Sequence, residues 1–168
     1  MIKPKIIVYS SNTGYTEQYA KMLGKALDMP SYKLGNVPKC HSGADVIYLG
    51  WLFAGNIIGY KKCAKRYKVR CVVGVGMSPP AAELADGLRA TEKIPSGVPV
   101  FYLQGGFNMA KLQGPLKLIM KIKCKEIAGR LSAKPELNDA EQLTYEMTQG
   151  QASAVDEANL AEVIALYK

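Results

Sequence analysis

Short runs of apolar and β-branched residues alternate along this chain with segments of helical periodicity. The run at residues 6–9 is bounded by polar residues, as expected for a strand that is buried on both faces. Further strands are predicted at residues 32–34, 45–50, 69–76 and 98–103. Because strands that alternate with helices assemble into a parallel sheet covered by helices, this pattern predicts an α/β fold. We expect a five-stranded parallel sheet with helices on both faces.

Helical patterns follow most of the predicted strands. The first helix has apolar residues at the i, i+3, i+4, i+7 and i+8 spacing of one face, namely Tyr19, Met22, Leu23, Ala26 and Leu27. A short basic helix is predicted at residues 59–67, and Ser78 followed by Pro79 is typical of an N-cap and a first helical position. The inward faces of this third helix and of the last helix are predicted to be Ala81, Leu84, Ala85 and Leu88, and Leu160, Val163, Ile164 and Tyr167. No repeat or linker interrupts the pattern, which indicates one domain over residues 1–168.

The segment at about residues 105–135 is longer than a strand–helix–strand unit requires, and we interpret it as an insertion in the domain. Residues 114–131 have the pattern of an amphipathic helix. Its apolar side is predicted to carry Leu116, Ile119, Met120, Ile127 and Leu131, and its lysine stripe Lys117, Lys121 and Lys125. Such a basic helix can contact an anionic membrane surface or hold the carboxylates of a substrate. An ordinary surface helix with a solvated lysine face is the alternative.

Basic residues outnumber acidic ones in all but the C-terminal part of the chain. The formal net charge is +8, and residues 136–168 contain seven of the 14 acidic residues and one of the 22 basic residues. A basic surface favours anionic partners. No nucleic-acid-binding motif accompanies it, so we expect no nucleic-acid partner.

No stretch of the sequence has the ~20 apolar residues that span a bilayer, and the N-terminus does not resemble a signal peptide. We therefore expect a cytoplasmic protein, with the basic helix as a candidate contact to the inner face of the membrane. Metal binding is not expected, because His41 is the only histidine and the four cysteines form no C-x-x-C pair. The cysteines are expected to be reduced and to pack in the interior.

Residues 11–16, SNTGYT, stand between the first predicted strand and the first helix, and they carry the strongest signal of a binding site. Gly14 allows the backbone to turn closely around an anion, and a helix N-terminus adds unpaired N–H groups and positive potential. The hydroxyls of Ser11, Thr13 and Thr16 can donate to phosphate oxygens. The loop lacks the lysine of a Walker A motif and the three spaced glycines of a dinucleotide fingerprint. It therefore favours a monophosphate site, and a structural turn without a ligand is the alternative.

The pattern [S/T]-x-T-G-x-T after a first strand resembles the phosphate loop of the flavodoxin family. The resemblance covers nearly the whole chain in the order of its elements. It implies a three-layer sandwich with strand order 2-1-3-4-5 and one bound flavin mononucleotide (FMN). It also implies that the FMN phosphate is held by Ser11, Asn12, Thr13, Gly14, Tyr15 and Thr16. The loops after the third and fourth strands would contact the isoalloxazine ring through Trp51, Leu52, Phe53, Ala54 and Gly55, and through Gly76, Met77 and Ser78.

Trp51 and Phe53 are candidates for stacking on the ring or covering its edge, and packing in the core is the alternative for each. The chain departs from flavodoxins in two respects. Flavodoxins are typically acidic, whereas this chain is basic. They also usually have aromatic and acidic residues in the loop after the fourth strand, where this chain has Met77, Pro79 and Pro80.

A second resemblance is confined to about twenty residues. The segment LQGGFNMAKLQGPLKLIMKIK, residues 103–123, is similar to a segment of the flavodoxin-like protoporphyrinogen oxidases of bacteria. In that branch the segment lies near the flavin and helps the substrate and a quinone to meet it. The resemblance implies that the insertion belongs to the functional site.

Three functions follow from these observations. The first is electron transfer or flavin-dependent oxidation with FMN as cofactor, with a redox partner protein or a small-molecule electron donor or acceptor. Because the flavin would carry the chemistry, no catalytic side chain is predicted. The second is a protoporphyrinogen-oxidase-like activity with a quinone acceptor, and the third is a non-redox basic binding module. We favour the first, because the loop at residues 11–16 is a stronger signal than the insertion.

Overall fold

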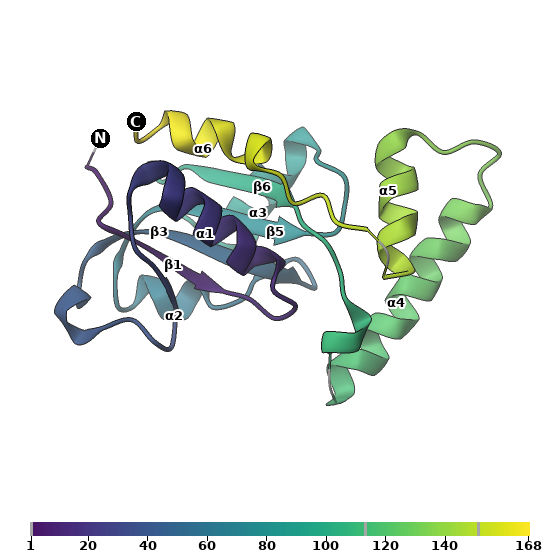
Figure 1. Ribbon diagram of the computed structural model, residues 1–168, viewed down its shortest axis with the longest axis horizontal. Coiled ribbons are helices and arrows are strands. Elements are labelled where there is room, and N and C mark those ends of the chain that lie inside the picture. Colours follow the sequence, from purple (N-terminus) through teal and green to yellow (C-terminus); the bar gives the residue numbers. More distant parts are fainter. Residues whose placement is uncertain (1, 113, 151) are drawn as a thin grey trace.

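A five-stranded parallel sheet forms the centre of the structure, a computed structural model that describes residues 2–112, 114–150 and 152–168. The strands of the sheet are β1 (Ile6–Ser10), β2 (Ser31–Lys33), β3 (Asp45–Phe53), β5 (Lys68–Gly76) and β6 (Val100–Gln104). They lie side by side in the order β2-β1-β3-β5-β6 (Figure 1). Each neighbouring pair is parallel, so the carboxyl ends of all five strands share one edge of the sheet.

Helices cover both faces of this sheet (Figure 1). One face carries α1 (Tyr15–Leu27) and α6 (Ala161–Ala165), and the other carries α2 (Tyr60–Ala64) and α3 (Ala82–Glu92). Successive strand residues alternate between the two cores: Ile7 belongs to the core of α1 and α6, and Val8 to the core of α2 and α3. Strands buried on both faces explain the continuous apolar runs of the sequence. The fold is therefore a flavodoxin-like three-layer α/β sandwich, with its parallel strands in the predicted order.

The C-terminal end of the chain packs against α1. The described residues include the short 3₁₀ helices η1 (Lys39–His41), η2 (Met109–Lys111) and η3 (Glu157–Leu160). η3 leads directly into α6. Leu160 and Val163 are fully buried there, Tyr167 is nearly so, and Ile164 is half-buried against the same core. The predicted inward face of the last helix is therefore confirmed.

The third helix begins later than the sequence predicts. Ala81 is the N-cap and α3 begins at Ala82, so Ser78 is not the cap. The physical reason is Pro80, because a residue that precedes proline is disfavoured in the helical conformation, and Pro79 therefore cannot open the helix. The predicted inward face is partly confirmed: Leu88 is buried, Leu84 and Ala85 are half-buried, and Ala81 is exposed.

The segment after the third predicted strand is a tight hairpin instead of an open loop. β3 continues to Phe53 and then pairs antiparallel with β4 (Asn56–Ile57). The two turn residues, Ala54 and Gly55, have φ values of 48° and 78°, as two-residue hairpin turns require. Alanine rarely takes a positive φ, so the Ala-Gly pair is a weak turn signal. The buried Glu92 carboxylate holds the hairpin in place, since its Oε1 accepts from the Ile57 N–H at 2.7 Å.

The insertion is longer than predicted and contains two helices. α4 (Gly114–Ser132) and α5 (Asp139–Thr148) pack against each other and extend beyond one end of the sheet (Figure 1). The chain returns to the sheet at an isolated bridge between Gly106 and Ser153. α5 was not predicted, although its start carries a capping box formed by Asn138 and Glu141.

The apolar side of α4 differs in part from the predicted one. Cys124 and Leu131 are buried and Leu116, Met120 and Ile127 are half-buried, whereas Ile119 is 45% exposed. The predicted lysine stripe is exposed along its whole length. Because α4 does not lie on the sheet, only a narrow stripe of it is covered. A second apolar stripe therefore faces outward, at Leu118, Ile119 and Ile122.

Three of the four cysteines are buried, as expected. Burial raises the pKa of the Cys63 and Cys71 thiols to about 12, and it also raises the pKa of Cys124. Cys40 is exposed. Within the ranges that the structure describes, no helix is both long enough and apolar enough to cross a membrane.

Candidate functional site

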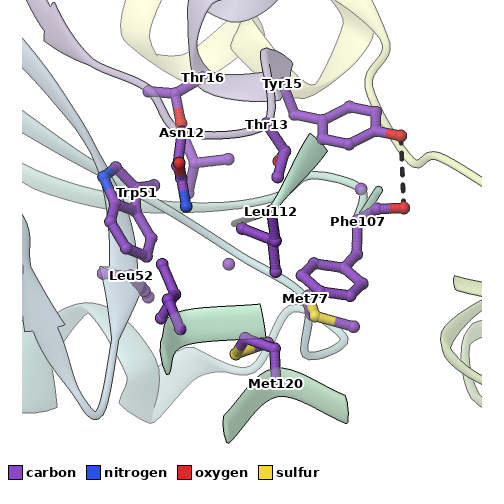
Figure 2. A pocket seen from close by; sticks show the side chains of 14 residues that line it. Asn12, Thr13, Tyr15, Thr16, Trp51, Leu52, Met77, Phe107, Leu112 and Met120 are labelled. Carbon is purple, nitrogen blue, oxygen red and sulfur yellow. Dashed lines mark hydrogen bonds between the residues drawn. The ribbon is translucent and has the colours of Figure 1, made fainter. Parts of the chain in front are cut away.

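A cavity opens at the carboxyl ends of β1, β3 and β5, where the first helix begins. In open parallel sheets this edge is where ligands bind, at the point where the strand order changes direction. The empty volume of this cavity, including the part open to solvent, is about 490 Å³. Its walls consist of Asn12, Thr13, Tyr15, Thr16, Trp51, Leu52, Val75, Gly76, Met77, Gly106, Phe107, Leu112, Leu116 and Met120 (Figure 2).

The loop at residues 11–16 forms one wall of the cavity. Gly14 has a φ of 99° and is the N-cap of α1. This left-handed conformation suits glycine, and it turns the loop into the helix. The Gly14 N–H donates to the Ser11 Oγ at 3.1 Å. Within the described ranges the N–H groups of Thr13, Tyr15 and Thr16 donate to no protein acceptor, so they are free to bind an anion at the helix N-terminus.

Thr16 is the buried polar residue of this wall. Its side chain points into the cavity (Figure 2), and the residue is 2% exposed. No hydrogen bond joins its hydroxyl to another group in the part of the chain that the structure describes. An unpaired hydroxyl at the cavity wall, next to three free N–H groups, forms a set of donors for a ligand with acceptor atoms.

The end of β3 forms the wall opposite the loop. Trp51 and Leu52 both line the cavity (Figure 2). The Phe53 ring centroid is 5.9 Å from that of Trp51, but Phe53 faces an adjoining groove together with Ala54 and Gly55. Trp51 and Phe53 point to the same face of β3 because they are two residues apart, but Phe53 is the last residue of the strand before the hairpin turn and lies beyond the cavity.

The end of β5 contributes Val75, Gly76 and Met77. The carbonyls that follow the strand are already paired. Met77 O accepts from the Gln104 side chain at 3.1 Å, and Ser78 O accepts from the Tyr102 hydroxyl at 2.6 Å. Burial raises the pKa of Tyr102, so its hydroxyl stays a donor. Among the described residues the N–H groups of Met77 and Ser78 have no acceptor, and they remain as donors near the cavity.

The segment after β6 closes the cavity, and the sequence did not identify most of its contacts. A Cβ atom on Gly105 would lie 2.7 Å from Val75 Cγ1, and one on Gly106 would lie 2.6 Å from the Tyr15 ring. The two glycines therefore let the chain pass close to Val75 and to the Tyr15 ring. Apolar side chains beyond them line the cavity, namely Phe107, Leu112 and Met120 (Figure 2) and also Leu116.

An apolar groove adjoins the cavity on the side of α3. It shares Leu52, Gly76 and Met77 with the cavity and continues between α3 and α4. Its empty volume is about 1280 Å³. Besides Phe53, Ala54, Gly55 and Ser78, its lining includes Leu84, Tyr102, Ile119 and Ile127, with Glu83 and Lys123 as the charged members.

The structure thus brings together eight of the fourteen residues that the sequence singled out, and they line one cavity: Asn12, Thr13, Tyr15, Thr16, Trp51, Leu52, Gly76 and Met77. Ser11 and Gly14 shape the loop behind this wall. Phe53, Ala54, Gly55 and Ser78 line the adjoining groove. Sequence reasoning missed the residues that cover the cavity. The pair Gly105–Gly106 after the fifth predicted strand is the sequence feature that could have indicated them, since such glycines mark a close approach of the backbone to another segment.

No protein-family model matches this sequence, and a search of curated proteins found no match.

We expect Gly106→Ala to destabilise the protein by about 1–3 kcal/mol, because the added methyl group displaces the Tyr15 ring. Urea unfolding measures this change in the free energy of unfolding. Gly129→Ala is the matched control: Gly129 lies within α4, and nothing is within 4 Å of its Cβ position. This control should be neutral or stabilise by up to about 1 kcal/mol. Equal stability of Gly106→Ala and the native protein would contradict the packing described for Tyr15.

Proposed function

We propose that this protein binds FMN in the cavity at the carboxyl edge of the sheet and uses it for electron transfer or for a flavin-dependent oxidation. The observation that carries the proposal is the unpaired hydroxyl of Thr16, a residue of the cavity wall, beside the free N–H groups of Thr13 and Tyr15. A phosphate monoester offers the acceptor oxygens that such a cluster of donors lacks. The flavodoxin-like fold supports the same ligand by analogy only, because one fold can host many functions.

The remaining walls fit the isoalloxazine part of FMN. Apart from the loop residues, the lining consists of aromatic and aliphatic side chains, methionines and glycines, with no charged side chain among the residues that the structure describes. Apolar walls with a few placed donors are typical of cofactor sites. Trp51 and Leu52 would contact the ring on one side, and the segment with Phe107 and Leu112 would cover it. The N–H groups of Met77 and Ser78 would donate to the carbonyl oxygens of the ring.

The flavin, when bound, would supply the ability to accept and give electrons. The protein's own residues have two tasks. Leu112, Leu116 and Met120 exclude water from the cavity, and the bonds from Tyr102 and Gln104 hold the backbone after β5 in a fixed position. Neither task involves contact with an electron donor or acceptor. Surfaces outside the cavity would therefore select that molecule. A redox partner protein and a small molecule are both compatible with this arrangement.

Replacement of Thr16 by valine tests the phosphate site. Valine keeps the shape of the side chain and removes the hydroxyl, so we expect the Kd for FMN to rise about 10- to 100-fold, as for loss of a hydrogen bond to a charged group. Fluorescence quenching of titrated FMN measures this Kd. Thr148→Val is the matched control, because the Thr148 hydroxyl donates to the Tyr145 carbonyl in α5, away from the cavity.

Two outcomes would overturn the proposal. If the native protein binds neither FMN nor riboflavin, the cavity is not a flavin site, and a non-redox basic binding module becomes the leading function. If Thr16→Val and Thr148→Val both bind FMN as the native protein does, the phosphate is not held by the loop.

A second candidate function is the oxidation of a porphyrinogen coupled to the reduction of a quinone. The apolar groove between α3 and α4 favours it, because the groove opens from the cavity and could place a large apolar substrate beside the cofactor. The FMN-loaded protein would then oxidise protoporphyrinogen in the presence of a quinone, as followed by porphyrin fluorescence. Leu84→Arg, which adds a charge to the groove, should abolish this oxidation without changing FMN affinity. Loaded protein that produces no porphyrin would exclude this candidate and leave the first one in place.

We also propose that α4 makes a peripheral contact with an anionic membrane. Leu118, Ile119 and Ile122 are 63%, 45% and 60% exposed. Ile122 lies four residues after Leu118 and three after Ile119, so its side chain neighbours both and joins them into one stripe. Lysines flank this apolar stripe on both sides, at Lys121, Lys123 and Lys125. Apolar side chains inserted between lysines are typical of helices that lie in the interface of a charged bilayer.

Sedimentation with lipid vesicles tests this contact. We expect binding to vesicles of phosphatidylglycerol and not to vesicles of phosphatidylcholine. A double variant, Leu118→Ser with Ile122→Ser, should weaken the binding at least tenfold, since burial of one such side chain contributes about 1.5–3 kcal/mol. Ile2→Ser is the control, because Ile2 is 57% exposed and lies outside α4. Equal binding of the double variant and the control would contradict the proposal.

A further inference from the structure

A lysine from the segment after β6 lies directly over the loop at residues 11–16. The Nζ atom of Lys111 is 3.5 Å from the position that a Cβ atom on Gly14 would occupy. Gly14 is the N-cap of α1, so the ammonium group lies near the N-terminus of this helix. Lys111 and the loop are far apart in the sequence, and only the fold brings them together.

The backbone of residues 108–112 is held in a defined turn. The Asn108 side chain accepts from the Ala110 N–H at 3.0 Å, and the Asn108 carbonyl accepts from the Lys111 N–H at 3.2 Å. The Leu112 N–H donates to the Met109 carbonyl at 3.3 Å. Buried side chains anchor the turn at both ends, since Phe107 and Leu112 are 6% and 3% exposed. The position of Lys111 over the loop therefore follows from the packing that covers the cavity.

The charge of Lys111 has no partner in the described ranges of the chain. No carboxylate lies within 4.0 Å of its ammonium group. The residues that line the cavity are all uncharged, and the loop itself contains no lysine or arginine. The ammonium group thus places a full positive charge next to Gly14, behind the wall that the loop forms, although Lys111 does not itself line the cavity.

We propose that Lys111 pairs with the phosphate of FMN and enables the protein to distinguish FMN from riboflavin. This inference rests on the proposed binding of FMN. A phosphate monoester carries about −1.5 to −2 charges near pH 7, more than the partial charge of about +0.5 at a helix N-terminus can balance. An ammonium group supplies a full charge and up to three N–H donors. The insertion would therefore complete the phosphate site as well as cover the ring.

The test compares FMN with riboflavin, which has the same ring and side chain without the phosphate. Lys111→Met removes the charge and keeps much of the length of the side chain. We expect it to raise the Kd for FMN about 10- to 100-fold and to leave the Kd for riboflavin unchanged. Lys111→Arg should retain most of the preference for FMN, and Lys117→Met, an exposed lysine of the same segment, should change neither Kd. The affinity of the native protein for FMN should also fall with added salt more steeply than that of Lys111→Met.

The outcomes separate this inference from the proposed function. Native protein that binds neither flavin contradicts the proposed function, and with it the inference. If the native protein binds FMN and riboflavin with equal affinity, it binds flavin without recognising the phosphate. This outcome overturns the inference alone. The inference is also wrong if Lys111→Met keeps the native preference for FMN. It is equally wrong if this variant loses riboflavin binding to the same extent as FMN binding, because Lys111 would then act on the shape of the cavity.

Discussion

The parallel pairing of β1, β3 and β5 is the constraint on which the rest of the structure depends. Parallel strands end at one edge of the sheet, and each must be followed by a connection that leaves this edge. Burial on both faces fixes the register of the strands, because a shift by one residue would exchange Ile7 and Val8 between the two cores. The loop before α1, the hairpin after β3 and the backbone after β5 therefore meet at one place.

The cavity at this edge combines two surfaces of different character. The loop at residues 11–16 presents unpaired N–H groups and the hydroxyl of Thr16, and the opposite walls are apolar and uncharged. A molecule with an anionic end and a flat apolar body matches both surfaces. The segment after β6 joins them, since it passes close to Tyr15, brings Lys111 to Gly14 and places Leu112 at the apolar part of the wall. One insertion would therefore supply both the apolar cover and the charge for an anionic ligand.

The same insertion leaves α4 with an unusual distribution of apolar residues. A helix that packs on a sheet buries one broad face, but α4 lies beyond the end of the sheet and buries only a narrow stripe. Its outward stripe of Leu118, Ile119 and Ile122 stands next to the groove that opens from the cavity, because Ile119 lines that groove. A membrane contact at this stripe would place the mouth of the groove close to the lipid surface, where apolar substrates partition.

The sequence by itself determined the strands, the first and last helices and the loop at residues 11–16, because these depend on local periodicity and on burial of each strand on both faces. It did not determine the start of α3, where the Pro79–Pro80 pair overrides the capping signal of Ser78, or the β3–β4 hairpin, whose turn uses an alanine at positive φ. Only the tertiary structure decided which residues cover the cavity and that Lys111 reaches Gly14. Such contacts join segments that are distant in the sequence, and no periodicity within either segment encodes the distance between them.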